Sequence, residues 1–153
     1  MARKIATNTT VTLEELLKFV RERHDAVLIT RREDGWPQAS PVTLGVDDGD
    51  RLVIASYPSR AKSKNLRRDS AATVCVLSDD FGGPWVQIDG YAEVIDVPAA
   101  VEPLVTYYRN IAGDHPDWDE YRQAMLEQGK CIIRITIERW GPIATGGFPP
   151  HLA

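Results

Sequence analysis

Six short segments of the chain carry the alternating apolar residues that are typical of β-strands. The clearest is KCIIRITIERW, residues 130–140, in which Ile133, Ile135 and Ile137 recur at every second position. Because side chains alternate between the two faces of a strand, this spacing puts the three isoleucines on one buried face. The other five segments cover residues 25–32, 38–47, 51–57, 71–80 and 85–97. Short strands joined by short turns predict a barrel or a sandwich.

Turn residues indicate how the first of these strands connect. The Asp34-Gly35 pair is typical of a tight hairpin turn, and DDGD at 47–50 predicts a second turn. Residues 25–57 are therefore expected to form a three-stranded antiparallel meander. Pro41 cannot donate a hydrogen bond to a neighbouring strand, so its segment is expected at a sheet edge or at a bulge.

Three segments have helical patterns instead. Thr12 with Glu15 three residues later is a capping box, which predicts a helix over 12–24. Two further helices are expected over 98–113 and 117–129, each with a glycine at its end. In the last of them Trp118, Tyr121 and Met125 recur at helical spacing, and we interpret them as core residues packed on the sheet. The fold class is therefore α+β.

The length of 153 residues is that of one domain. We expect a single domain over 1–153, with tails at 1–11 and 146–153. No apolar run approaches the roughly 20 residues of a membrane span, and the start of the chain has no apolar leader, so a cytoplasmic location is expected. The formal charge of −4 disfavours general binding of nucleic acid.

Several kinds of reactive site find no support. Cys75 and Cys131 lie in apolar segments without Cys-x-x-Cys spacing, so both are expected to be buried thiols of a reducing compartment. None of the three histidines has a second ligand at metal spacing, and no metal site is expected. Glycine-rich dinucleotide and phosphate loops are absent, as is a Gly-x-Ser-x-Gly elbow. If the protein is an enzyme, a bound cofactor is expected to bring the reactivity.

The stretch SRAKSKNLRR, residues 59–68, holds five basic residues and no acidic one. Ser63 is expected to N-cap a short helical turn, and Arg67 and Arg68 then stand where the helix dipole favours cations. Arg60 and Lys62 stand at the positive end, where a cation is disfavoured unless an anion neutralises it. The stretch therefore predicts a phosphate site. The alternative is a solvated basic surface that pairs with Asp or Glu elsewhere.

The chain resembles the pyridoxamine-5′-phosphate-oxidase-like family of flavin- and deazaflavin-binding proteins. The resemblance spans about residues 12–142 and rests on four stretches, 34–42, 59–76, 85–94 and 108–125. The last, YRNIAGDHPDWDEYRQAM, is especially similar to small actinobacterial members that use coenzyme F420. The resemblance implies a split β-barrel of the FMN-binding type, with six or more mainly antiparallel strands and flanking helices. It also implies a homodimer in which both subunits line each cofactor groove.

The same resemblance assigns roles to individual residues. Arg60, Lys62 and Asn65 match the residues that hold the cofactor phosphate, with Ser63 beside them. The wall that meets the flavin or deazaflavin ring is expected to comprise Gln38, Ser40, Pro41, Val42, Thr43, Ala55 and Ser56. Trp85 and Gln87 match positions that reach the cofactor from the partner subunit. Alternatively, Trp85 is a core aromatic residue at a strand end and Gln87 faces solvent.

The implied function is an F420H2-dependent reductase that transfers a hydride to a small conjugated or carbonyl-containing substrate. Coenzyme F420 carries a phosphate and an oligoglutamate tail, so Lys64, Arg67 and Arg68 could meet the tail. No side chain can be assigned as the proton donor. Two alternatives remain open: an FMN-dependent oxidase or reductase of the pyridoxamine-phosphate-oxidase type, and a non-catalytic carrier of F420 or flavin. Tyr107, Tyr108 and Arg109 could line an entrance to the site.

Overall fold

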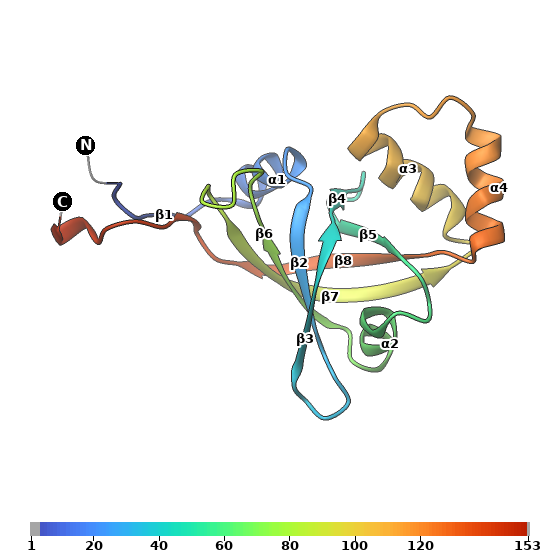
Figure 1. Ribbon diagram of the computed structural model, residues 1–153, viewed down its shortest axis with the longest axis horizontal. Coiled ribbons are helices and arrows are strands. Elements are labelled where there is room, and N and C mark those ends of the chain that lie inside the picture. Colours follow the sequence, from blue (N-terminus) through green and yellow to red (C-terminus); the bar gives the residue numbers. More distant parts are fainter. Residues whose placement is uncertain (1–3, 153) are drawn as a thin grey trace.

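A computed structural model describes residues 4–152 of the protein, and its centre is a seven-stranded antiparallel sheet (Figure 1). The strand order is β3-β2-β6-β7-β8-β5-β4. The strands are β2 (Asp25–Arg31), β3 (Pro37–Thr43), β4 (Gly45–Val46), β5 (Leu52–Ser56), β6 (Ala71–Val76), β7 (Val86–Asp96) and β8 (Cys131–Trp140). Each of the six predicted strand segments is confirmed as a strand, and the segment 38–47 is divided into β3 and β4.

The sheet curls so that its two edges are joined by the chain itself. β3 forms one edge and β4 forms the other, although only Leu44 separates them in sequence. The position of β3 at an edge confirms the expectation from Pro41. The predicted meander over 25–57 is wrong in its third strand, because β5 pairs with β4 and β8 and not with β3. The sheet is thus a curled half-barrel, in agreement with the expected fold class.

Four α-helices flank the sheet: α1 (Leu13–Arg21), α2 (Ala61–Arg68), α3 (Val101–Ala112) and α4 (Trp118–Gln128). The capping box at α1 is confirmed, since the Thr12 side chain accepts from Glu15 N–H and Glu15 accepts from Thr12 N–H. Figure 1 shows α3 and α4 together at one end of the sheet, whereas α2 lies beside the lower part of the β2–β3 hairpin. The helix α2 is formed by the basic stretch.

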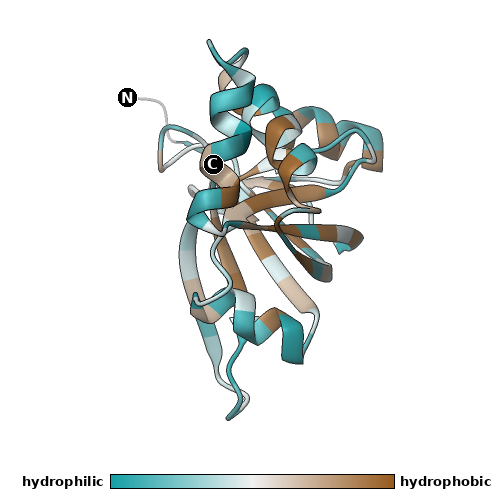
Figure 2. Ribbon diagram, turned by 90° about the vertical axis from the view of Figure 1, so that its right-hand side faces the viewer, coloured by the Kyte–Doolittle hydropathy of each residue, from teal (hydrophilic) through white to brown (hydrophobic). Residues whose placement is uncertain are grey.

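The core lies inside the curl of the sheet. Its fully buried side chains include Leu28, Leu52, Ile88, Ile133 and Ile135, each 0% exposed. Figure 2 shows hydrophobic residues concentrated in the strands, with many of the hydrophilic residues in helices and loops. The alternation that predicted β8 therefore reports real burial for Ile133 and Ile135, whereas Ile137 is only partly buried near the strand end.

The segments near the two ends of the described chain, β1 and β9, lie side by side, away from α3 and α4 (Figure 1). The short strands β1 (Thr7–Thr9) and β9 (Ile143–Thr145) pair antiparallel, and the Thr7 and Thr145 hydroxyls are 2.6 Å apart. A short 3₁₀ helix, η1 (Pro150–Leu152), follows. Thr7–Thr9 fall within the expected N-terminal tail. No helix in residues 4–152 is long and apolar enough to cross a membrane.

Candidate functional site

The basic helix α2 begins earlier than the sequence suggested. Arg60 is its N-cap residue, in an extended conformation and without a side-chain capping bond. The prediction that Ser63 is the N-cap is wrong, because Ser63 lies in the first helical turn and is 0% exposed. Its hydroxyl lies 3.4 Å from the Ser56 hydroxyl and 3.7 Å from Cys131 Sγ. Burial against β5 and β8 has outweighed the local preference of serine for a cap.

The amino end of α2 carries positive charge that no acidic side chain offsets. The N–H groups of residues 61–63 precede the first intrahelical bond, from Lys64 N–H to the Arg60 carbonyl. Within residues 4–152, neither Arg60 nor Lys62 has an ion pair. Burial, and then the nearby charge of Arg60, lower the pKa of Lys62. A bound anion beside Lys62 would favour its charged form and so act against both the burial and the charge of Arg60.

The carboxyl end of α2 is arranged differently. Arg67 forms a 2.8 Å ion pair with Asp96, at the end of β7. Arg68 donates to the Arg31 carbonyl and to Asn65 Oδ1. The surface-pairing alternative therefore holds for Arg67, and the anion interpretation applies only to the amino end of the helix.

Asn65 points into the protein. Its side-chain amide donates a 3.1 Å hydrogen bond to the Thr30 hydroxyl, which donates to Gln38 Oε1 at 3.3 Å. Both polar ends of the Asn65 side chain are thus used, because Oδ1 accepts from Arg68. The structure brings Gln38 and Asn65 together through Thr30, and this chain fixes α2 against β2 and β3. Asn65 therefore positions the helix through hydrogen bonds at both ends of its side-chain amide.

The predicted ring wall on β3 divides between two faces. Residues opposite each other in an antiparallel pair share a face, and Ser40 and Val42 lie opposite the buried Leu28 and Ala26. Gln38, Ser40 and Val42 therefore point toward the inside of the curl, whereas Pro41 and Thr43 are exposed on the other face. On β5, Ser56 is buried and Ala55 is partly buried.

Ser40 has an unusual feature. Its hydroxyl oxygen is buried and is the only such side-chain N or O atom without a hydrogen-bond partner in the described part of the chain. Most buried side-chain polar atoms have a hydrogen-bond partner, so this hydroxyl is an exception among the described residues. The atom lies on the inner face of β3, between Gln38 and Val42, where the sequence placed a cofactor ring.

Tyr107 reaches the same region from α3. Its hydroxyl donates a 2.8 Å hydrogen bond to the Thr43 carbonyl. Burial raises the pKa of Tyr107, and a hydrogen bond with the Ala55 backbone acts in the opposite direction. The side chain thus touches the backbone of two predicted wall residues on different strands. The sequence named Tyr107 only as an entrance candidate, since no spacing pattern links α3 to β3.

Trp85 and Gln87 lie apart from α2. Val86 pairs with Val76 at the far end of β6, whereas α2 ends just before the start of β6. Roughly 17 Å of β6 separates the carboxyl end of α2 from the Val76–Val86 pair. Trp85 is 40% exposed and Gln87 is exposed, so Trp85 is not a core residue. One chain therefore does not bring these two residues together with Arg60 and Lys62.

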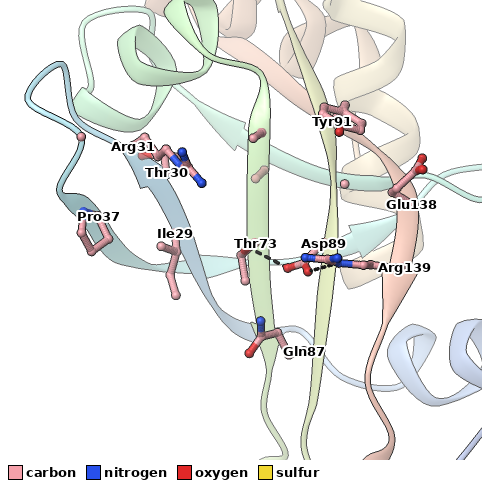
Figure 3. Close-up of a pocket in the computed structure, with 14 residues that line it drawn as sticks. Ile29, Thr30, Arg31, Pro37, Thr73, Gln87, Asp89, Tyr91, Glu138 and Arg139 are labelled. Atoms are coloured by element: carbon pink, nitrogen blue, oxygen red, sulfur yellow. Dashed lines mark hydrogen bonds and ion pairs between the residues drawn. The ribbon is translucent and has the colours of Figure 1, made fainter.

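A cleft of about 940 Å³ crosses the outer face of the sheet (Figure 3). Thr30 and Arg31 lie at the end nearer α2, and Gln87 lies at the other end. Between them Asp89 accepts from the Thr73 hydroxyl at 2.8 Å and pairs with Arg139 at 2.8 Å. The hydrogen bond from Arg139 is the main cause that lowers the pKa of Asp89. Of the predicted site residues, only Gln87 lines this cleft.

The residues of the last predicted helix have a packing role. Met125 is buried, and Trp118 and Tyr121 form a cluster of rings with Tyr108 and His115, with centroid distances of 5.2 to 5.8 Å. This agrees with the core interpretation for Met125, although Trp118 and Tyr121 remain partly exposed. Arg109 lies over the Trp118 ring at 4.9 Å.

Both cysteines are free thiols. Cys131 is 0% exposed, as expected, whereas Cys75 is only partly buried on the outer face of β6. Burial raises the pKa of each thiol. Among residues 4–152, no group of three or more His, Cys, Asp or Glu side chains is arranged to hold a metal ion.

The chain is similar to several known proteins. It is 28% identical over 134 residues to an F420H(2)-dependent biliverdin reductase of Mycobacterium tuberculosis, covering 86% of this chain and 89% of that protein. A conserved hypothetical protein of Mycobacterium tuberculosis has a similar structure, with a TM-score of 0.74, 22% identity, and coverage of 94% of this chain and 89% of the other.

A solved structure described as an F420 reductase has a TM-score of 0.60 and 20% identity, and covers 80% of this chain and 94% of its own. These two structural likenesses establish the fold. The family model described as pyridoxamine 5′-phosphate oxidase matches residues 12–144, which is most of the sequence. The chain therefore belongs to the pyridoxamine 5′-phosphate oxidase family, as its sequence motifs indicated.

Proposed function

We propose that the protein is an F420H2-dependent reductase that acts in the cytoplasm on a small conjugated or carbonyl-containing organic substrate. The observation that carries the proposal is the amino end of α2, where Arg60 and Lys62 have no acidic partner among the described residues. The relative from Mycobacterium tuberculosis named as an F420H(2)-dependent reductase supports the choice of cofactor. The two free thiols suit a reducing cytoplasm.

The residues around α2 fit a phosphate. Arg60 and Lys62 would hold it together with the N–H groups of residues 61–63, because charge-assisted hydrogen bonds and a helix amino end both favour an anion. Ser63 would contribute only its backbone N–H, since its side chain is buried against Ser56. Asn65 would act indirectly, by holding α2 against Thr30.

The inner face of β3 fits the ring of the cofactor. Ser40 carries a buried hydroxyl that has no hydrogen-bond partner among the described residues. Gln38 and Val42 flank it on the same face. Tyr107 would hold the edge of this wall in place through the Thr43 carbonyl.

Trp85 and Gln87 would reach the cofactor from a second subunit. They lie near the end of β6 away from α2, and a homodimer would bring the partner's copies to the cofactor. The 940 Å³ cleft on the outer face, which Gln87 lines, would then lie toward the partner subunit.

Reduced F420, when bound, supplies a hydride. The substrate would take up the hydride at one carbon atom and a proton from water at the other end of the reduced bond. The protein residues orient the two partners and exclude water from the contact between them. No described side chain is assigned as the proton donor.

A second candidate is an FMN-dependent oxidase or reductase, which the description of the matching family favours. Titrating the purified protein with F420 and with FMN, each at low and at moderate salt, separates the two. We expect F420 to bind more tightly, with an affinity that falls as salt rises. Tight binding of FMN without binding of F420 would overturn the proposed function.

One variant tests whether Lys62 contacts the phosphate. Lys62→Ala should weaken binding of F420 by about 1.5–3 kcal/mol, because a charge-assisted contact is lost. Lys18→Ala, an exposed lysine on α1, is the matched control and should leave the affinity unchanged. An unchanged affinity in the Lys62 variant would remove this residue from the site.

Turnover then distinguishes a reductase from a carrier. Reduced F420 is offered with a panel of enones, quinones, tetrapyrroles and nitro compounds, and its oxidation is followed by absorbance. We expect oxidation above background with at least one class. Tight binding of F420 without turnover of any compound would support a non-catalytic carrier instead.

A further inference from the structure

Two cations lie close to the ring of Tyr57, directly after β5. The guanidinium carbon of Arg60 is 5.7 Å from the ring centroid, and Lys130 Nζ is 5.4 Å from it. Both distances are within the range of cation–π contacts. The pairing of Ser56 with Cys131 explains the meeting, because it sets Tyr57, which follows β5, beside Lys130, which precedes β8. The fold thus adds Lys130 to the basic end of α2.

The carboxylate best placed to neutralise Lys130 is already engaged. Asp96 lies opposite Cys131 in the β7–β8 pair, next to Lys130, but it forms its ion pair with Arg67. Among residues 4–152, no acidic side chain pairs with Arg60, Lys62 or Lys130. The Tyr57 hydroxyl is turned to Gln128, which is neutral. Three positive charges therefore gather here without a compensating negative charge.

Because Lys130 comes from a different element than Arg60 and Lys62, one phosphate would not contact all three cations in the same way. Arg60 and Lys62 belong to the first turn and cap of α2, where the helix N–H groups also lie. Lys130 comes from another element, the connection from α4 to β8, and is held at Tyr57. The position of Lys130 suits a second anionic group on the same ligand, at a short distance from the first.

We propose that Lys130, together with Arg60, forms a second anion subsite beside the phosphate site, and that it binds a carboxylate of the ligand's tail. The inference rests on the proposed function, because the oligoglutamate of F420 supplies such carboxylates and FMN has none. Lys130 is thus a specificity-determining residue that selects a cofactor with a carboxylate-bearing extension.

The test compares two ligands and four proteins. The ligands are F420 with its glutamate tail and a truncated, tail-less form that keeps the phosphate but lacks both the lactyl group and the glutamates, and so has no carboxylate. The proteins are wild type, Lys130→Gln, Lys130→Arg and Lys18→Gln. We expect Lys130→Gln to weaken binding of the tailed form roughly 3- to 10-fold and to leave the tail-less form within about twofold. Lys130→Arg should retain the wild-type affinity, and Lys18→Gln should change neither.

The outcomes separate the two proposals. If the tailed form binds wild type tightly and Lys130→Gln weakens it no more than the tail-less form, the second subsite is wrong while the proposed function stands. If wild type binds neither form, the proposed function fails and this inference fails with it. A urea unfolding curve of Lys130→Gln that matches wild type shows that an affinity change is not a folding defect.

Discussion

The Tyr107 hydroxyl donates a 2.8 Å hydrogen bond to the Thr43 carbonyl, at the point where the chain passes from one edge of the sheet to the other. Two further side chains bind carbonyls of the same crossing. His24 Nδ1 lies 2.8 Å from the Leu44 oxygen, and Asn110 donates to the Val46 oxygen at 3.0 Å. Because β3 and β4 do not pair with each other, these bonds hold the crossing in place of a strand ladder.

Tyr107→Phe should destabilise the protein by about 0.5–1.5 kcal/mol, because the Thr43 carbonyl loses its donor while the ring remains packed. Urea unfolding followed by circular dichroism measures the change. Tyr91→Phe is the matched control, since Tyr91 is 57% exposed, and it should leave the unfolding midpoint unchanged. Equal stability of the two variants would contradict a role of Tyr107 in holding the crossing.

Gly90→Ala should disrupt the middle of the sheet. A Cβ atom at Gly90 would collide with the Thr136 carbonyl oxygen and stand 2.8 Å from Ile135 Cγ2. The register shifts at this point, which also sets Arg139 opposite Asp89. We expect a loss of at least the roughly 1–3 kcal/mol typical of an overpacked core, seen as a lower thermal midpoint.

The control for this variant is Gly82→Ala. The nearest atom to a Cβ there is Asp80 Oδ1, at 3.8 Å, so the substitution should be tolerated. A thermal midpoint of Gly90→Ala equal to that of Gly82→Ala would show that β7 and β8 can separate at the bulge without cost.

The pair formed by Asp89 and Arg139 should make stability depend on acid pH. The Arg139 hydrogen bond lowers the folded-state pKa of Asp89 below its ordinary 3.8, so the unfolded state binds more protons in this range. The stabilisation is present above pH 3.8 and is lost as the pH falls through the lowered pKa. Arg139→Gln should therefore be less stable than wild type at neutral pH, and the difference should shrink below pH 3.8.

Urea midpoints measured from pH 7 down to pH 3 test this pair. Lys18→Gln is the control, because Lys18 is exposed and forms no ion pair within residues 4–152. A difference between wild type and Arg139→Gln that stays constant over the whole range would show that the arginine acts by packing alone.

Local pattern predicted most of the secondary structure, because alternation, capping boxes and turn glycines act over a few residues. The pairing of β5 with β8 could not be predicted from local pattern, since it depends on how the sheet curls. Ser63 shows a local rule failing: its burial beside Ser56 placed it inside α2 and left Arg60 at the cap.

The amino end of α2 was predicted as an anion site because Arg60 and Lys62 are neighbours in sequence. Lys130 could not be added in the same way, since only the pairing of Ser56 with Cys131 brings it to Tyr57. Tyr107 likewise meets Thr43 through tertiary packing.

The charge of Lys62 should lower the stability of the ligand-free protein, although the same charge is proposed to bind the cofactor phosphate. Burial, and then the charge of Arg60, lower its folded-state pKa below the ordinary 10.5, which means that its charged form is disfavoured in the folded state. The unfolded state therefore binds more protons, and stability rises as the pH increases from the lowered pKa toward 10.5. Lys62→Met removes the charge and keeps an apolar stem. Without ligand, it should have a higher urea midpoint than wild type at pH 7, and the difference should close as the pH approaches 10.5.

The order should reverse when F420 is added. Binding to the folded state alone stabilises a protein in proportion to affinity, and wild type should gain more than Lys62→Met because it keeps the phosphate contact. Lys18→Met, on the exposed side of α1, should follow wild type in both conditions. If Lys62→Met is the less stable protein without ligand at pH 7, the charge is compensated within the chain, and the case for an anion at this end of α2 loses its physical basis.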